Sequence, residues 1–194
     1  MARNTISESH AAMLWHACLD APTLESLLIA IGIETGARAS ELLTIATQDF
    51  NFADCSVFIV GLKGSLSGRY PLSAELIRSI NEFLRTHLLL NQNKPLSTWD
   101  NDHRISTRYR RLEREFRARV DVAIGIDGIE YTLHSLRRRI GQLVYQANDR
   151  DIMAAKAVLR HKSVTSTQHY LNHISLSDVT PQVAEFNKKF KKSG

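Results

Sequence analysis

The sequence predicts a mainly helical domain that carries a small three-stranded antiparallel β-sheet. Most of the 194 residues fall into stretches whose apolar side chains recur at the spacing of one helix face. One internal stretch, residues 47–72, is instead β-branched and aromatic with glycine-rich turns, which is typical of short strands. The length suits one domain, and no Pro/Gly/Ser-rich linker divides it, so a single unit is expected over residues 1–194.

Two helices are expected at the N-terminal end. Thr5 and Glu8 have the spacing of a capping box, and a helical apolar pattern then continues to Pro22. Thr23 can cap a second helix that buries one apolar face. Arg38 is therefore expected just beyond a helix end.

The sheet is expected between Thr47 and Leu72. Residues 56–60 are β-branched and aromatic, and the glycine-rich residues 61–68 form a turn that leads into a returning strand. Pro71 cannot donate a ladder hydrogen bond, so this strand is predicted to lie at an edge or to end there.

Further helices are expected after the sheet. Ser73 can cap one that runs to about residue 89, and another is expected over residues 101–120. A third begins at Thr132 or Ser135 and runs to about residue 148, and a shorter one runs from residue 149 or 150 to residue 159. Thr165 and Gln168 form another capping box, so a new helix is expected to begin between His161 and Tyr170. On one continuous helix their nine-residue spacing would place the two side chains on opposite faces. A break after His161 allows both to approach one target.

The helix over residues 101–120 has an apolar and a basic face. The apolar stripe, expected in the core, contains Ile105, Tyr109, Leu112, Phe116 and Val120. Off it lie seven arginines, namely Arg104, Arg108, Arg110, Arg111, Arg114, Arg117 and Arg119. Only Glu113 and Glu115 oppose them, so most of these charges cannot be paired within the helix. A phosphate-binding face is predicted, with a solvated face of ion pairs as the alternative.

The overall charge favours a polyanionic partner. The net charge is +5 and the pI is near 9.4, which fits nucleic acid best. The longest early apolar run, residues 27–31, is far shorter than the roughly 18 residues that a membrane span needs. Cys18 and Cys55 are widely separated, which predicts small buried thiols in a reducing, cytoplasmic compartment.

Several residues have the chemistry that attack on a phosphodiester requires. Arg38 and Arg137 can fork onto the non-bridging oxygens, where negative charge grows in the transition state. His134 lies three residues before Arg137, so the two share a helix face and can share one phosphate. Tyr170 can supply the hydroxyl, but its ordinary pKa of about 10 requires cations around the target.

These motifs resemble those of the tyrosine recombinase (phage integrase) family over nearly the whole chain. The family's three boxes fall, in family order, on residues 35–42, on His134 with Arg137, and on His161 with Tyr170. The strand-turn lysine of the family falls on Lys63, within the turn at residues 61–64.

The resemblance implies a DNA strand transferase that uses no cofactor and no metal. Tyr170 would attack the scissile phosphate and form a 3′-phosphotyrosyl link, while Lys63 would protonate the leaving oxygen. His134 is expected to help deprotonate Tyr170 or to position the phosphate, and His161 to hydrogen-bond it. Glu41, in the first box, is expected to orient nearby basic groups.

The resemblance also implies double-stranded DNA as partner. On DNA the chain would form a homo-tetramer that exchanges strands between two duplexes, and when free it would be a monomer. DNA contacts are predicted for Arg104, Arg108, Arg111, Arg114, Arg138 and Arg160. Accessory DNA-bending proteins and a nucleoid-associated cytoplasmic location are expected. The chain is predicted to match the family's catalytic domain, without the N-terminal core-binding domain of many relatives; both a short natural form and a fragment remain open. The basic tail, residues 180–194, is expected to fray or to dock, including by exchange between subunits.

The chain departs from the family pattern at a few positions. Arg160 stands where a glycine usually precedes the third-box histidine, and Arg138 where a second histidine often follows the second-box arginine. The spacing of the turn leaves Lys63 displaced by one position, so Arg69 is the fallback cation of the hairpin.

Three alternatives stand beside this interpretation. One is a non-catalytic DNA-binding protein with the recombinase fold, and another is a type IB topoisomerase-like enzyme that needs no partner duplex. The third is a metal site, since His169 and His173 have the four-residue spacing of zinc ligands on a helix. That motif lacks the usual intervening glutamate.

Overall fold

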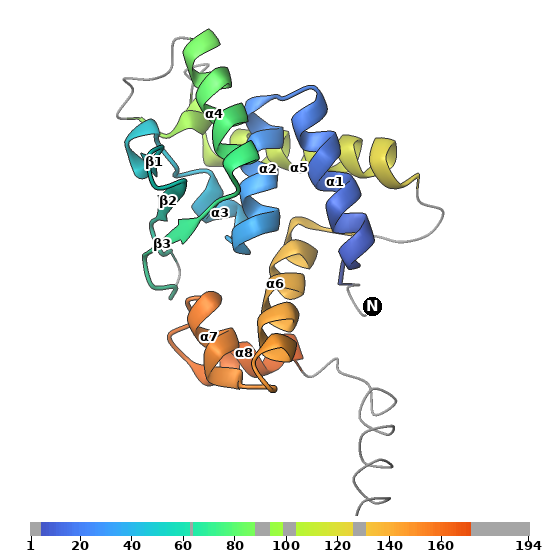
Figure 1. Ribbon diagram of the computed structural model, residues 1–194, viewed down its shortest axis with the longest axis vertical. Coiled ribbons are helices and arrows are strands. Elements are labelled where there is room, and N and C mark those ends of the chain that lie inside the picture. The colour runs from blue at the N-terminus through green and yellow to red at the C-terminus, as the bar shows by residue number, and fades with distance from the viewer. Residues whose placement is uncertain (1–4, 63, 88–93, 99–103, 126–130, 172–194) are drawn as a thin grey trace, which may run out of the picture.

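A computed structural model describes residues 5–62, 64–87, 94–98, 104–125 and 131–171 of the chain (Figure 1). It contains, in chain order, α1 (Glu8–Asp20), α2 (Leu24–Thr35), α3 (Ala39–Leu42), η1 (Thr47–Asp49), β1 (Phe50–Asn51), β2 (Ser56–Ile59), β3 (Gly68–Pro71), α4 (Ala74–Thr86), η2 (Leu96–Thr98), α5 (Ile105–Ile124), α6 (Leu133–Ala147), α7 (Ile152–Val158) and α8 (Val164–Leu171). The predicted class, mainly helical with a three-stranded antiparallel sheet, is confirmed.

Helix α2 is the centre of the core. The helices α1, α4, α5 and α6 all pack against it, and in Figure 1 it lies between them. Ten of its twelve residues are buried, whereas the sequence predicted only one buried face. The reason is that residues outside the predicted stripe, such as Ile29 and Ile33, are also apolar, and a helix that is apolar all round is stable only inside.

The starts of α2 and α4 follow the predicted capping chemistry, and the start of α1 does not. The hydroxyls of Thr23 and Ser73 accept amide hydrogen bonds at the starts of α2 and α4, as predicted. The cap of α1 is Ser7, whose Oγ accepts from the amide of His10 at 3.1 Å, so the predicted capping box at Thr5 is wrong.

The sheet is ordered β1-β2-β3, and all pairs are antiparallel. Pro71 ends the edge strand β3, as predicted. The turn between β2 and β3 lies against the segment after α7: the amide of Leu66 donates to the carbonyl of Arg160 at 2.9 Å, and Ser65 pairs with His161 in an isolated β-bridge. This contact fastens the hairpin to the C-terminal helices.

The predicted break after His161 is confirmed, because α7 ends at Val158 and α8 begins at Val164. The hydroxyl of Ser163 accepts from the amide of Thr165 at 3.2 Å, so the helix begins slightly before the predicted box. Helices α6, α7 and α8 pack together at one end of the molecule (Figure 1).

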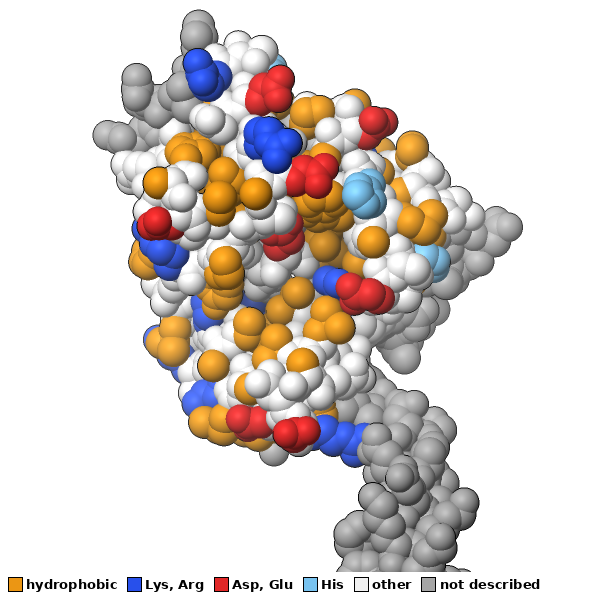
Figure 2. Space-filling model, viewed as in Figure 1, with side chains coloured by type: hydrophobic (Ala, Val, Ile, Leu, Met, Phe, Trp, Pro, Cys, Tyr) orange, Lys and Arg blue, Asp and Glu red, His pale blue; other side chains and the backbone are white. Residues whose placement is uncertain are grey.

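One face of the molecule bears acidic, basic and apolar side chains in alternation, so it presents no field of a single sign (Figure 2). A hollow of about 570 Å³ lies between α1, the end of β3 and α6, with Trp15, Leu72 and Leu143 among its lining residues. Within the part of the chain that the structure describes, no helix is long and apolar enough to cross a membrane.

Candidate active site

An open groove of about 620 Å³ lies where α3, the N-terminal half of α5 and the start of α6 meet. Three predicted site residues, Arg38, His134 and Arg137, line it. They come from two motifs about a hundred residues apart, which α2 and α6 bring together by packing against each other. The groove therefore gathers two guanidinium groups and an imidazole around one space.

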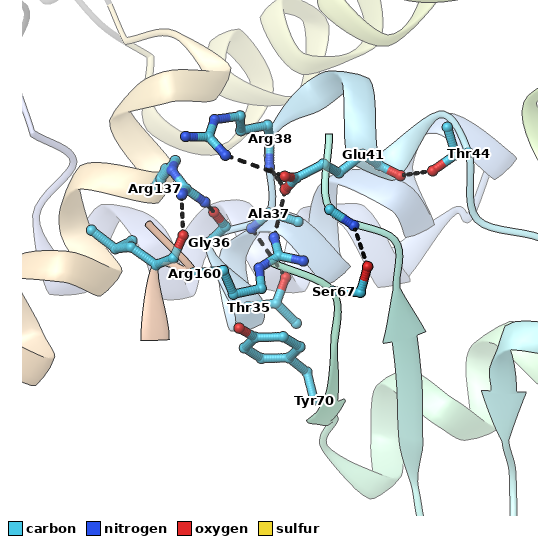
Figure 3. Close-up of polar contacts among 12 residues, drawn as sticks. Thr35, Gly36, Ala37, Arg38, Glu41, Thr44, Ser67, Tyr70, Arg137 and Arg160 are labelled. Atoms are coloured by element: carbon cyan, nitrogen blue, oxygen red, sulfur yellow. Dashed lines mark hydrogen bonds and ion pairs between the residues drawn. The ribbon is translucent and has the colours of Figure 1, made fainter. Parts of the chain in front are cut away.

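Arg38, which lines this groove, is held by Glu41 (Figure 3). It is the N-cap residue of α3, and the carboxylate of Glu41 accepts from its amide at 2.9 Å and from its Nη1 at 3.2 Å. Glu41 is fully buried, yet its pKa lies below the ordinary value. Burial raises this pKa, but the Arg38 amide and the charges of Arg160 and Arg137 lower it by more. The ionised carboxylate thus orients Arg38, as the sequence predicted.

Arg137 is fixed by two main-chain carbonyls. It is 1% exposed; its Nη1 donates to the carbonyl of Gly36 at 2.6 Å, and its Nη2 donates to the carbonyl of Leu159. Gly36 has a φ of 65°, and a Cβ there would lie 3.0 Å from the Cβ of Ile140. Only glycine allows this close, left-handed helix end, and the helix end aims the carbonyl at Arg137.

The two histidines differ in environment. His134 is half-buried in the groove wall, whereas His161 is 2% exposed and its Nδ1 lies 3.0 Å from Oγ1 of Thr167. Burial, followed by the positive charges of Arg137 and Arg38, lowers the pKa of His161 to about 4. His161 is therefore neutral at pH 7, and it lies within electrostatic range of both arginines and of His134.

Two predicted residues lie at the edge of what the structure describes. Tyr170 is placed on α8, which follows His161 directly and packs on α6 and α7, but its side chain is outside the described part. Lys63 lies outside the described residues; Leu62 and Gly64 flank it in the β2–β3 turn.

Arg69, the fallback cation, is on β3, and its side chain contacts residues of the neighbouring strand β2. Its Nη1 donates to Oγ of Ser56 at 3.2 Å, and its guanidinium carbon lies 5.9 Å from the ring centroid of Phe58.

Arg160, predicted to contact DNA, lies inside the protein instead. It is 3% exposed; its Nη2 donates to Oε2 of Glu41 at 2.5 Å, and its guanidinium carbon lies 5.0 Å from the ring centroid of Tyr70. Its φ is 55°, a left-handed conformation that costs a non-glycine residue about 1 kcal/mol. The glycine expected at this position would adopt this backbone without strain, whereas the arginine present here is strained and forms a buried ion pair with Glu41.

The basic face of α5 is only partly as predicted. Arg108 donates to the carbonyl of Leu43 and to Oγ of Ser97, and Arg111 donates to the carbonyl of Ser97 and pairs with Glu25 at 3.1 Å. Both arginines are half-buried. Their hydrogen bonds to residues of other segments hold α5 onto the domain. Of the remaining predicted DNA contacts, Arg104 and Arg114 are exposed and Arg138 is half-buried.

Arg110 is a groove residue that the predicted DNA contacts did not include. It lines the groove beside Arg38, together with Ser106 and Glu113 from the same helix face. Ile105 and Tyr109, predicted in the core, are 53% and 41% exposed and also line the groove. The four-then-three spacing of positions 106, 110 and 113 was the signal in the sequence, but the predicted apolar stripe extended about two turns too far toward the N-terminus.

The alternative metal pair cannot be placed, since the side chain of His169 and all of His173 lie outside the described part. Among the described residues, no group of three or more His, Cys, Asp or Glu side chains could hold a metal ion.

The groove gathers Arg38, Arg137 and His134, with a neutral His161 in electrostatic range, and such a cluster of positive charge is suited to an anionic group. The family model described as the phage integrase family matches residues 4–175, so this chain belongs to that family, the tyrosine recombinases. Tyrosine recombinase XerC of Neisseria gonorrhoeae is 28% identical over 138 residues, which are 70% of this chain and 43% of that protein. XerC of Neisseria meningitidis serogroup B is 27% identical over the same length. The chain thus spans less than half the length of these curated relatives.

Solved structures show the same fold. The XerA recombinase superposes with a TM-score of 0.71 at 22% identity, covering 94% of this chain and 63% of that one. XerH bound to its palindromic difH substrate gives a TM-score of 0.73 at 18% identity, covering 94% of this chain and 53% of that one.

Proposed function

We propose that this protein is a DNA strand transferase that performs site-specific recombination with Tyr170 as nucleophile. The observation that carries the proposal is the convergence of Arg38, His134 and Arg137 on one groove, with His161 in electrostatic range. Family membership adds to it, and related solved structures include XerH on difH DNA and a lambda integrase tetramer on a Holliday junction.

The reaction exchanges one phosphodiester for another. The hydroxyl oxygen of Tyr170 attacks the phosphorus and its proton passes to His134 or to solvent water, while a tyrosyl–phosphate bond forms as the bond to the 5′-oxygen breaks. Lys63 gives that leaving oxygen a proton, which yields a 3′-phosphotyrosyl link and a free 5′-hydroxyl. A 5′-hydroxyl from a second duplex reverses the attack and completes the exchange. The phosphodiester energy is conserved in the covalent link.

The groove residues stabilise the charge that grows on the non-bridging oxygens. Arg38 presents a planar fork to those oxygens, and Arg137, held in the groove wall by its two carbonyl partners, adds a second positive charge beside them. His161 is neutral at pH 7, so its role is a hydrogen bond to the phosphate rather than a charge. His134 positions the phosphate or helps to deprotonate Tyr170.

The partners that follow from this activity are double-stranded DNA and three further copies of the chain, assembled across two duplexes from a free monomer. Arg104, at the N-cap of α5, and Arg110 and Arg114 on the helix are exposed and suited to DNA phosphates. Accessory DNA-bending proteins and a nucleoid-associated cytoplasmic location accompany the proposed role. The basic tail, residues 180–194, is proposed to exchange between subunits.

The test does not require a known target site. The chain is incubated with nicked duplexes that carry a randomised core, the mixture is denatured, and DNA that stays covalently attached to protein is sequenced. Covalent capture is expected for the parent chain and not for Tyr170→Phe. Tyr145→Phe, on α6 outside the groove lining, is the matched control and should capture as the parent does.

Other outcomes separate the alternatives. Capture no greater than for Tyr170→Phe would favour a non-catalytic DNA-binding protein. Loss of capture in Tyr109→Phe with retention in Tyr170→Phe would move the nucleophile to the tyrosine that lines the groove. With the captured site in hand, a product that joins two different duplexes indicates recombination, and plasmid relaxation alone indicates a topoisomerase-like activity.

A further inference from the structure

The side chain of Arg160 lies between an edge strand and the helix that carries Arg38 (Figure 3). Its guanidinium is over the ring of Tyr70 on β3 and bonds Oε2 of Glu41 on α3. The hydroxyl of Tyr70 in turn donates to the carbonyl of Val158 at 3.0 Å, which fixes the ring. The guanidinium thus has a defined position although Arg160 itself belongs to the loop between α7 and α8.

The ion pair and the ring compensate for a costly burial. Among the described residues, Nε and Nη1 of Arg160 have no hydrogen-bond acceptor. The left-handed backbone and the two nitrogens without an acceptor both lower the stability of the fold. The remaining contacts of the side chain must offset this cost. Those remaining contacts all converge on Glu41 and Tyr70.

Glu41 is shared between two arginines. It is the one fully buried carboxylate among the residues that the structure describes. Oε2 takes the Arg160 bond and the amide of Arg38, while Oε1 makes a longer, 3.2 Å contact with Nη1 of Arg38. The Arg38 side chain is still 23% exposed at the groove. Because Arg160 already balances the carboxylate, the charge of Arg38 remains available to a ligand.

We propose that Arg160 is a positioning residue for strand transfer, which acts through Glu41 to keep Arg38 both oriented and charged toward the substrate phosphate. This inference rests on the proposed function. Without the Arg160 guanidinium, the carboxylate would be balanced by Arg38 alone, and Arg38 would be drawn from the phosphate into a closed ion pair.

The left-handed backbone of Arg160 decides which substitutions test its role. Arg160→Gly removes the guanidinium and accepts a φ of 55° without strain, so the loop conformation is kept. Arg160→Lys retains the charge but loses the planar fork. Each is made in the parent and in a Glu41→Gln background. Arg119→Met is the structural control, because Arg119 holds α5 to the carbonyls of Ala17 and Ala21 away from the groove.

Adduct formation is measured in single turnover at saturating protein, and duplex affinity is measured in a Tyr170→Phe background. Arg160→Gly is expected to slow adduct formation by about tenfold or more, with a change in Kd of less than about threefold, since one phosphate contributes little to duplex affinity. Arg160→Lys should recover part of the rate. In the Glu41→Gln background, Arg160→Gly should have almost no further effect on the rate. Arg119→Met should lower Tm and leave the saturated rate unchanged.

A parent-like rate in Arg160→Gly, or a loss of equal size with and without Glu41→Gln, would overturn the role of Arg160. So would a loss that matches the unfolded fraction. Titration with inorganic phosphate, followed by NMR of the arginine Nε–Hε signals, tests the same link without turnover. Weaker phosphate binding in Arg160→Gly supports the role of Arg160 even if the parent forms no adduct. The missing adduct would then count against the proposed function alone. Unchanged phosphate affinity would overturn it.

Discussion

Arg137 on α6 donates a 2.6 Å hydrogen bond to the carbonyl of Gly36, which lies 101 residues earlier at the left-handed end of α2. This bond joins the two motifs that supply the groove arginines, because Arg38 follows Gly36 by two residues. The same guanidinium also bonds the carbonyl of Leu159, next to the segment that carries His161. A single side chain therefore sets the relative position of all three motifs.

Arg137→Met should destabilise the protein strongly. The substitution leaves the buried carbonyls of Gly36 and Leu159 without their donor, and each orphaned group costs about 1–3 kcal/mol. The free energy of unfolding, from urea denaturation, is expected to fall by about 2–5 kcal/mol. Arg117→Met, at an exposed position of α5, should change it by less than about 0.5 kcal/mol. An equal effect at both positions would contradict the structural role of Arg137.

Gly36→Ala should cost more than Gly125→Ala, although both glycines have left-handed backbones, with φ of 65° and 57°. A Cβ at position 36 would lie 3.0 Å from Ile140, whereas a Cβ at position 125 meets no described residue within 4 Å. Gly125→Ala is expected to lose about 1 kcal/mol from backbone strain alone, and Gly36→Ala at least about 1 kcal/mol more from the clash. Denaturant unfolding of the two variants measures the difference, and equal losses would show that the approach of Ile140 is relaxed without cost.

Stability should fall as the pH drops from 6.5 toward 4. Burial and nearby arginines lower the folded-state pKa of His161 to about 4, while the unfolded chain binds the same proton near 6.5. The unfolded state therefore takes up the proton first as the pH falls, and unfolding is favoured. The expected loss is on the order of 3 kcal/mol across this range, with full stability above pH 6.5. Glu41, whose pKa is also lowered, adds a loss of the same sign as it protonates.

His161→Gln should flatten this pH dependence, because the depressed titration is removed. His87→Gln, at the exposed end of α4, is the matched histidine control and should keep the parent slope. Urea unfolding at intervals between pH 4 and pH 8 gives both curves. Equal slopes in His161→Gln and the parent would assign the pH dependence to other groups.

Arg110→Ala and Arg108→Ala should have opposite profiles. Arg110 lines the groove, so its loss should weaken duplex binding and reduce the slope of log K against log salt by about one unit, with little change in Tm. Arg108 bonds Leu43 and Ser97, so its loss should lower the free energy of unfolding by about 1–2 kcal/mol. Fluorescence anisotropy over a salt series and urea unfolding measure the two quantities. A normal salt slope in Arg110→Ala would exclude a phosphate contact there.

Much of the fold could be predicted because the relevant signals are local. Thr23 and Ser73 cap the helices that they precede, Pro71 ends an edge strand, and a new helix begins after His161. Each depends on dihedral preferences or on hydrogen bonds within a few residues. The cap at Ser7 was missed because two hydroxyls compete at the start of α1, and sequence alone does not rank them.

The amino-acid sequence was enough to predict the helical class, the hairpin and the order of the three motifs, since periodicity, capping and turn chemistry depend on neighbours within a few residues. Tertiary structure alone decided where the arginines point. Arg160 turns inward to Glu41, Arg111 bonds a carbonyl of η2, and Arg110 lines the groove. A long, flexible guanidinium is directed by whichever carboxylates and carbonyls other segments bring within its reach, and these partners lie as many as 119 residues away in the chain.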